Sequence, residues 1–451
     1  MGVTTFEDLQ KQRLSSEEPP PPLPETAEAA LGATEMRHGT TSAPQLVPDD
    51  TWGLQSLAHF EKTLSPELKQ GKEEVAHLLH TSCLSKHEPD KFLKTLEQRA
   101  ARAISGGDKD ALVGMTVALS NVEPIKPRGG ECAYLPDSVL VTRILSVRYP
   151  SIMMEVKDTV TGNMHAMRIR MFHSNRAHSP EYEEKLLAST QQWADSEEAI
   201  ARQASCGCPA HLVASQKGLA VPLYVGNIAD IPKAFVLDGF YFFSRVQIFE
   251  DLHGEFNFSS LITAGLSLNA KEYIAHRLLQ IVLKLQQALL SHNNLEWENI
   301  SARPDGSFLL SGFDACVPFG TAVGEQIRLS GKTLEPTLRI QENVYAEKAV
   351  PSSTSDLWSL GMLLYELFTG GRLPYTDNET AYTEDPLAMA RHLIGVEAGP
   401  EQLVAILNDA NCPVRWKLLI MRLLYPVRGA RITARGILTD FPDLVGHRLP
   451  R

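Results

Sequence analysis

The spacing of apolar residues divides the chain into a helical start, a strand-rich middle and a helical end. Apolar residues recur at helical intervals over 52–106, which predicts a small helical segment. Short β-rich runs at 139–172 predict three antiparallel strands. A charged helical stretch begins at Pro180, and strand-like runs return at 219–227 and 234–249. The middle of the chain therefore predicts five strands around one helix.

The second half of the chain carries helical patterns. Apolar residues over 274–289 lie on one face of a long amphipathic helix, and further helices are predicted at 356–368 and 416–425. A strand-rich half followed by a helix-rich half indicates an α+β fold with two lobes. The expected organisation is a disordered, acidic, Pro-rich tail at 1–50, a helical extension at 51–134, and a two-lobed domain at 135–450, with an N-lobe at about 135–250 and a C-lobe at about 251–450.

Composition narrows the classes of function. The 451 residues include 43 Lys and Arg against 54 Asp and Glu, a formal net charge of −11 that argues against nucleic acid as the main partner. The sequence predicts no transmembrane segment, and its first residues lack the apolar core of a secretory signal. The six cysteines do not have the spacing of zinc ligands, so no metal site is predicted from them.

One polar segment follows the long helix and has the pattern of a catalytic loop. Residues 292–299 have the sequence HNNLEWEN, which is similar to the kinase pattern H-R-D-L-x-x-x-N. His292, Leu295 and Asn299 match this pattern in register. Asn294 falls where the pattern has its catalytic Asp.

Further motifs follow in the order that kinases have them. The triplet Gly-Phe-Asp at 312–314 aligns with the metal-binding triplet D-F-G, and the segment SDLWSLG at 355–361 is similar to the helix start D-x-W-S-x-G. Each motif alone is a weak signal, because short matches recur by chance. Their order and spacing together make the signal strong.

These motifs resemble the protein-kinase catalytic domain over about 135–450. Within kinases the chain most resembles the rhoptry kinase family of apicomplexan parasites, including its pseudokinases and its branch without a glycine-rich loop. That finer resemblance is carried by FLLSGFDACV at 308–317, by the helical ending at 412–438 and by the N-terminal extension. It implies a bilobal protein-kinase-like fold with an N-terminal helical extension. It also implies structural roles for His292, Phe313, Glu342, Asp356 and Arg431, with Glu342 and Arg431 forming an ion pair.

The chain departs from the kinase pattern where phosphate transfer needs specific side chains. Arg168 replaces the strand lysine, keeping the charge in a different geometry. Asn294 replaces the catalytic Asp and cannot accept the substrate proton, and Gly312 replaces an Asp that would bind Mg²⁺. Asp314 lies two residues on and is a partial substitute. Asn299 remains, but one amide does not make a magnesium site.

Two further features of the predicted N-lobe affect whether it can bind a nucleotide. The first hairpin, at 145–152, contains no glycine, so its backbone cannot approach a triphosphate closely, and bulky Arg148 and Tyr149 at its tip would fill that space. The acidic partner of Arg168 would come from the following helix. The sequence leaves three candidates open, which are Glu181, Glu183 and Glu184. An equal alternative is that these glutamates form a solvated acidic face of the helix and pair with no arginine.

The expected function is that of a catalytically impaired pseudokinase that acts as a protein-binding or allosteric module. The alternative is an active atypical Ser/Thr protein kinase without a glycine-rich loop. No cofactor is expected as a fixed component, and any ATP binding would be weak and independent of Mg²⁺. The partner is expected to be another kinase or a host protein. From the family resemblance alone, the protein is expected to be a secreted parasite effector of the rhoptry, dense granule or parasitophorous vacuole.

Overall fold

The computed structural model describes most of the chain after its N-terminal tail. The described residues are 52–82, 91–125, 135–148, 151–173, 180–205, 208–237, 239–250, 258–323, 329, 332–344, 349–375, 386–395 and 400–446. The tail predicted to be disordered, 1–50, lies outside them, as do Tyr149 and the side chain of Arg148.

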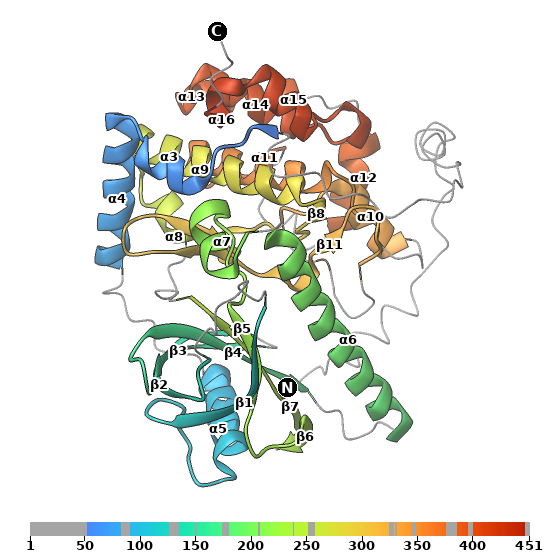
Figure 1. The fold of residues 1–451 in the computed structure, drawn as a ribbon. Helices are drawn as coiled ribbons and strands as arrows, with labels where there is room; N and C mark the ends of the chain where they lie inside the picture. The colour runs from blue at the N-terminus through green and yellow to red at the C-terminus, as the bar shows by residue number, and fades with distance from the viewer. Residues whose placement is uncertain are drawn as a thin grey trace, which may run out of the picture. The chain divides into compact units, whose positions relative to one another are not determined.

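An antiparallel sheet forms the strand-rich part of the molecule (Figure 1). Its seven strands lie in the order β4-β3-β2-β1-β5-β7-β6, and β4 also pairs with β7. All strands except β6 are therefore paired in a closed ring, which forms a barrel. The strands are β1 (Thr116–Pro124), β2 (Ser138–Arg148), β3 (Ser151–Asp158), β4 (Met164–His173), β5 (Tyr224–Ile228), β6 (Ala234–Leu237) and β7 (Phe240–Phe249).

The barrel encloses an apolar core that helix α5 (Lys91–Ser105) completes. Buried core residues on β3 and β4 are Ile152, Met154, Val156, Met167 and Ile169. Because consecutive side chains of a strand point to opposite faces, Arg168 and Arg170 on β4 point away from this core. The sequence pattern thus fixes both the core and the side on which the two arginines lie.

Strand β1 belongs to the predicted helical extension and was not predicted. It pairs with β2 on one side, where Val117 lies opposite Val139, and with β5 on the other, where Leu119 lies opposite Ile228. The extension therefore supplies the strand that closes the barrel.

The other half of the described chain is mainly helical. Helix α9 (Leu268–Gln287) begins after Ser267, whose Oγ accepts a hydrogen bond from the Ala270 N–H, and it is buried along most of its length. Helices α11 (Ser355–Thr369) and α14 (Val414–Leu423) share its apolar core. The remaining helices of this half are α8 (Phe258–Thr263), α10 (Pro336–Val344), α12 (Pro386–Gly395), α13 (Val404–Asp409), α15 (Ala434–Asp440) and α16 (Pro442–Val445).

The first two described helices of the extension, α3 (Leu57–Lys62) and α4 (Pro66–Ser82), pack against α9 (Figure 1). Glu61 forms an ion pair with buried Arg277 and accepts a hydrogen bond from the Tyr273 Oη at 3.0 Å. The extension is thus part of both halves of the fold. No described helix is both long enough and apolar enough to span a bilayer.

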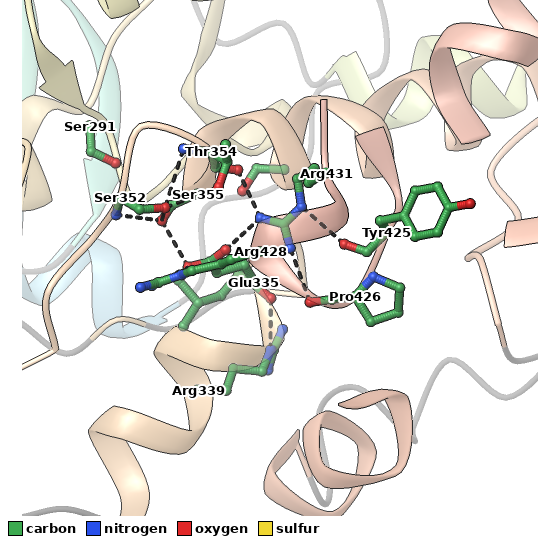
Figure 2. A network of polar contacts seen from close by, with 12 residues as sticks. Ser291, Glu335, Arg339, Ser352, Thr354, Ser355, Tyr425, Pro426, Arg428 and Arg431 are labelled. Atoms are coloured by element: carbon green, nitrogen blue, oxygen red, sulfur yellow. Dashed lines mark hydrogen bonds and ion pairs between the residues drawn. The ribbon is translucent and has the colours of Figure 1, made fainter. Parts of the chain in front are cut away.

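A buried ion pair joins the end of the chain to the segment before α10 (Figure 2). The Arg431 Nη1 donates to the Glu335 Oε2 at 2.5 Å, and both side chains are fully buried. Arg431 also donates to the carbonyl oxygens of Thr354, Tyr425 and Pro426. Burial alone would raise the pKa of Glu335, but the charges of Arg431 and Arg428 outweigh burial and hold that pKa below its usual value.

The expected partner of Arg431 was Glu342, and this requires correction. The carboxylate opposite Arg431 is Glu335, the residue immediately before α10, whereas the side chain of Glu342 lies outside the described residues. The hydrogen bonds to three carbonyl oxygens and to Glu335 occupy four N–H groups of the guanidinium. Kinase spacing alone did not distinguish two glutamates seven positions apart.

Replacing Glu335 with alanine should strongly lower the free energy of unfolding. Removing one partner of a buried pair leaves the charge of Arg431 uncompensated, at a cost of about 3–5 kcal/mol. Chemical or thermal unfolding of Glu335→Ala measures this loss, and Glu401→Ala, at an exposed position, is the matched control. If the two variants were equally stable, the pair would not hold this part of the fold together.

Candidate functional site

Helix α6 (Pro180–Ser205) carries the carboxylates that face the sheet, and it runs alongside the sheet toward the helical half (Figure 1). Near its C-terminal end, Ile200, Ala201 and Ala204 are buried in the apolar core. Glu197 and Glu198 lie one turn before them and are nearly inaccessible, at 4% exposed each. The buried face of the last turns therefore brings both carboxylates to the sheet.

Arg168 and Arg170 share the carboxylate of Glu197. The Arg168 Nη2 donates to its Oε1, and the Arg170 Nη2 donates to its Oε2. Gln247 on β7 completes the group: its Oε1 accepts from the Arg168 Nε at 2.9 Å, and its Nε2 donates to the Glu197 Oε2 at 3.2 Å. Burial lowers the pKa of both arginines, against the opposing effect of nearby Asp314.

The predicted acidic partner of Arg168 requires correction. Glu197 is that partner; Glu184 is exposed, and the side chains of Glu181 and Glu183 lie outside the described residues. The helix is longer than its first charged turns suggested, and its functional carboxylate lies near the other end. The signal in the sequence was the helical spacing of Glu197 with the apolar residues 200, 201 and 204.

Further contacts fix α6 to both halves of the fold. Glu198 accepts two hydrogen bonds from Arg245 on β7, each of 2.9 Å. The Arg202 Nε donates to the Ile125 carbonyl oxygen at the end of β1, and the Gln203 Nε2 donates to the Ala288 carbonyl oxygen after α9. This helix is held from both sides, so Glu197 is rigidly placed.

Asp314 faces the two arginines. Its Oδ1 lies 3.4 Å from the Arg168 Nη1 and 3.8 Å from the Arg170 Nη2, and its side chain is 40% exposed. Asp314 was predicted as a partial substitute for a metal ligand. That role stays a prediction; in this structure the Asp314 carboxylate faces both arginines, so that Arg168 contacts Glu197, Gln247 and Asp314 together.

The loop at 292–299 is held by backbone contacts with α11. The Asp356 carboxylate accepts hydrogen bonds from the N–H of His292 at 2.6 Å and from the N–H of Asn293 at 3.0 Å. The His292 Nε2 lies 2.9 Å from the Ser311 carbonyl oxygen, and its ring meets that of Phe313 edge-on at 5.3 Å. Burial lowers the pKa of His292 to about 4, so this ring is neutral at pH 7.

The residues aligned with the metal ligands contact one another. The Asn299 Nδ2 donates to the Asn294 carbonyl oxygen at 2.7 Å. Gly312 has a left-handed backbone, with φ of 79°, and a Cβ added there would lie 2.5 Å from the Asn299 Oδ1. Asn299 therefore fills the space that a side chain at 312 would need. Among the described residues, no group of three or more His, Cys, Asp and Glu is placed to hold a metal ion.

Comparison with known proteins identifies the fold. A family model described as Kinase-like matches residues 136–428, more than half of the chain. The structure is similar to that of ROP2 from Toxoplasma gondii, described as a virulence factor with a protein-kinase fold and no enzymatic activity, at a TM-score of 0.60 and 15% identity over 83% of this chain and 95% of that one.

Two further solved structures are similar to the chain. A rhoptry kinase from Toxoplasma gondii matches at a TM-score of 0.55 and 14% identity, over 83% of this chain and 93% of that one. The ROP18 kinase domain, in complex with AMP-PNP and sucrose, matches at a TM-score of 0.56 and 14% identity, over 84% of this chain and 95% of that one. No curated protein matches the sequence.

Introducing aspartate at position 312, where the kinase pattern has the Asp of D-F-G, should destabilise the protein. In Gly312→Asp the new Cβ would displace the amide of the Asn299 side chain, and loss of its hydrogen bond to the Asn294 carbonyl oxygen costs about 0.5–1.5 kcal/mol. Gly320→Asp is the matched control, because Gly320 has φ of 74° and nothing within 4 Å of an added Cβ. Thermal unfolding should show a larger loss for Gly312→Asp. Equal losses would mean that Asn299 yields to the new side chain without losing that hydrogen bond.

Proposed function

Because the chain belongs to the kinase-like family, we propose that it is a pseudokinase that uses this fold to bind a protein partner and does not transfer phosphate. One observation carries the proposal: position 312 has no acid, and the Asn299 side chain occupies the space that a side chain at 312 would need. Asn294 adds to this, because an amide has no basic oxygen to accept a hydroxyl proton.

The contacts of Arg168 support the same proposal. In phosphate transfer a cation at this strand position must reach the nucleotide phosphates. Here the guanidinium already donates to Glu197, Gln247 and Asp314 and is 8% exposed. A phosphate would have to compete with the Asp314 carboxylate for it.

One observation favours the alternative, an active atypical Ser/Thr kinase. The pairing of Arg168 with Glu197 on α6 has the form of the strand-to-helix ion pair that active kinases require. In that case Asp314 would turn from the arginines to a metal ion. We rank this second, because it leaves the role of the catalytic base unfilled at Asn294.

The partner and the place of action are proposals as well. We propose another kinase or a host protein as the partner, and secretion from a parasite as the setting, with the rhoptry, dense granule or parasitophorous vacuole as the compartment. The support is the fold shared with ROP2, which is described as a virulence factor without enzymatic activity.

Phosphate transfer should be absent. With radiolabelled ATP and Mg²⁺ or Mn²⁺, incorporation into the chain itself or into a basic protein substrate should equal that of Arg168→Ala. The comparison uses Arg168 because it is the cation that any transfer in this site would need. Turnover by the parent that disappears in Arg168→Ala would establish the alternative function.

Any nucleotide binding should be weak and independent of Mg²⁺. Asp314→Asn should strengthen it by up to about fivefold, because the substitution removes a partly exposed carboxylate that competes for Arg168 and Arg170. Calorimetry with ATP measures the affinity, and Asp409→Asn, at an exposed site, controls for net charge. Low-micromolar binding that requires Mg²⁺ and survives Arg168→Ala would contradict this account.

A further inference from the structure

Helix α14 has apolar side chains on the face that enters the core and also on the face that meets solvent. Its buried face consists of Trp416, Leu419, Ile420 and Leu423. On the other side Val414 is 63% exposed and Leu418 is 43% exposed. A helix at a protein surface is usually polar on its outer face, so this second apolar face departs from the usual pattern.

The exposed apolar residues form one stripe. Val414, Leu418 and Met421 are spaced at i, i+4 and i+7, which places them on one side of the helix. Met421 is half-buried. An apolar stripe of this spacing is the surface on which a second helix packs in helix–helix contacts. These three residues are here called the α14 stripe.

Cations lie on both flanks of the α14 stripe. On one flank Arg415 and Arg422 each form an ion pair with an aspartate of the last two helices, α15 and α16. On the other flank the Lys417 Nζ donates a hydrogen bond to the Asn408 Oδ1 of α13. That amide is neutral, and Lys417 forms no ion pair with any described residue. Lys417 is therefore available to an acid from another chain.

The charge of this surface is opposite in sign to that of the whole chain. Residues 410–439 contain six cations and no Asp or Glu, whereas the chain has a formal net charge of −11. Two of the six, Arg428 and Arg431, turn inward to Glu335. The other four lie on α14 and α15, and only two acids lie on α14 to α16, so two positive charges remain in surplus. The surface thus attracts an anionic partner.

The start of α14 strengthens this attraction. Its first turn contains Arg415 and Lys417 and no acid. The start of a helix carries a partial positive charge, so cations there are unfavourable and an anion from another chain is stabilised. The Arg422 carbonyl oxygen accepts a hydrogen bond from the Ile432 N–H at 3.1 Å, which brings exposed Arg435 close to the other end of the helix.

A second copy of the chain does not fit the α14 stripe. Two α14 helices packed on each other, in either direction, would bring the flanking cations of one copy against those of the other. Like charges at such separations repel each other. Helix α14 contains no Asp or Glu that would relieve this repulsion. The partner therefore has to bring the negative charge.

An anionic membrane fits less well than an acidic protein segment. Because Arg415 and Arg422 are already paired, Lys417 and Arg435 are the cations left for lipid headgroups. Segments that bind anionic lipids have clusters of about four to eight cations. The α14 stripe also lacks the Trp and Tyr side chains that are enriched at membrane interfaces. A protein segment with carboxylates at defined positions needs only these two cations.

We infer that the α14 stripe is the docking surface for an amphipathic helix of a partner protein. Apolar residues of that helix, spaced four apart, pack on Val414 and Leu418. Asp or Glu side chains on its flanks pair with Lys417 and Arg435. The inference rests on the proposed protein-binding function and adds to it the surface and the chemistry of the partner.

The test measures binding of a fluorescein-labelled helical peptide by fluorescence polarisation. The peptide is about 18 residues long, enough to form a helix in an alanine background, with leucines along one face and glutamates on both sides of them. The double variant Val414→Ser and Leu418→Ser should bind about tenfold more weakly than the parent, because two apolar contacts are lost. Val160→Ser with Val236→Ser, also at exposed positions, is the matched control and should bind as the parent does.

Charge reversal tests the flank of the stripe. Lys417→Glu should weaken binding of the glutamate peptide by about fivefold, the worth of an exposed ion pair. A twin peptide with lysine in place of each glutamate should bind Lys417→Glu more tightly than it binds the parent. Lys109→Glu, at an exposed position far along the sequence, changes the net charge equally and should have neither effect. Each variant is checked for a parent-like melting temperature, and if the double serine variant does not fold, the charge reversal decides.

Four results would overturn the inference: no binding of the peptide by the parent, equal binding of a scrambled peptide without the leucine face, equal binding by the double serine variant, or equal effects of Lys417→Glu and Lys109→Glu. A parent dimer in analytical ultracentrifugation that the serine variant abolishes would assign the stripe to a second copy instead. Binding to phosphatidylserine vesicles without binding to the peptide would assign it to a membrane. Phosphate transfer by the parent would contradict the proposed function, and label incorporation measures it separately.

Discussion

Two arginines on one strand share one buried carboxylate, and the remaining structure of the site depends on this arrangement. Two like charges on the same face of β4 would repel each other in a setting of low exposure. Glu197 bridges them, Gln247 adds neutral hydrogen bonds, and Asp314 supplies the second negative charge from the opposite half of the fold. The group is internally balanced. It ties strand, helix and loop together.

That balance is the physical basis on which the proposed function departs from phosphate transfer. In a kinase the corresponding positions keep charge available for nucleotide and metal. Here Asp314 faces two arginines, Asn299 donates a hydrogen bond to its own loop, and the Asn299 side chain lies in the space next to Gly312. The scaffold around them is intact, since the Asp356 carboxylate still holds the backbone of the loop. The proposed binding of a partner would need only this scaffold.

The sequence allowed the elements to be predicted wherever one face of an element is apolar. Strands β2 to β4 and the buried helices α9 and α11 follow directly from periods of two and of about 3.6 residues. Strand β1 carries this pattern only briefly: Val117 and Leu119 alternate with exposed residues, and beyond them no residue is fully buried and Asn121 has φ of 50°. Pairing with the strands on either side therefore contributes more to β1 than its own sequence pattern does.

The glutamate that pairs with each arginine was harder to predict than the positions of helices and strands. Arg168 and Arg431 were identified from motifs, but the carboxylates that meet them, Glu197 and Glu335, depend on how a helix end and a loop pack. A motif fixes the spacing along the chain. It does not fix which of several nearby glutamates is carried to the arginine, since that is decided by the three-dimensional path of the intervening backbone.

The position of β1 also sets limits on how the barrel forms during folding. Its two neighbours, β2 and β5, are separated by a long stretch of chain that includes two more strands and α6. Pairing of this kind requires closure of a large loop, which slows folding. A chain cut at the start of the kinase-like region would lack β1 and would present two unpaired strand edges, each a template for association with other chains. The extension is thus a solubility element of the lobe that it completes.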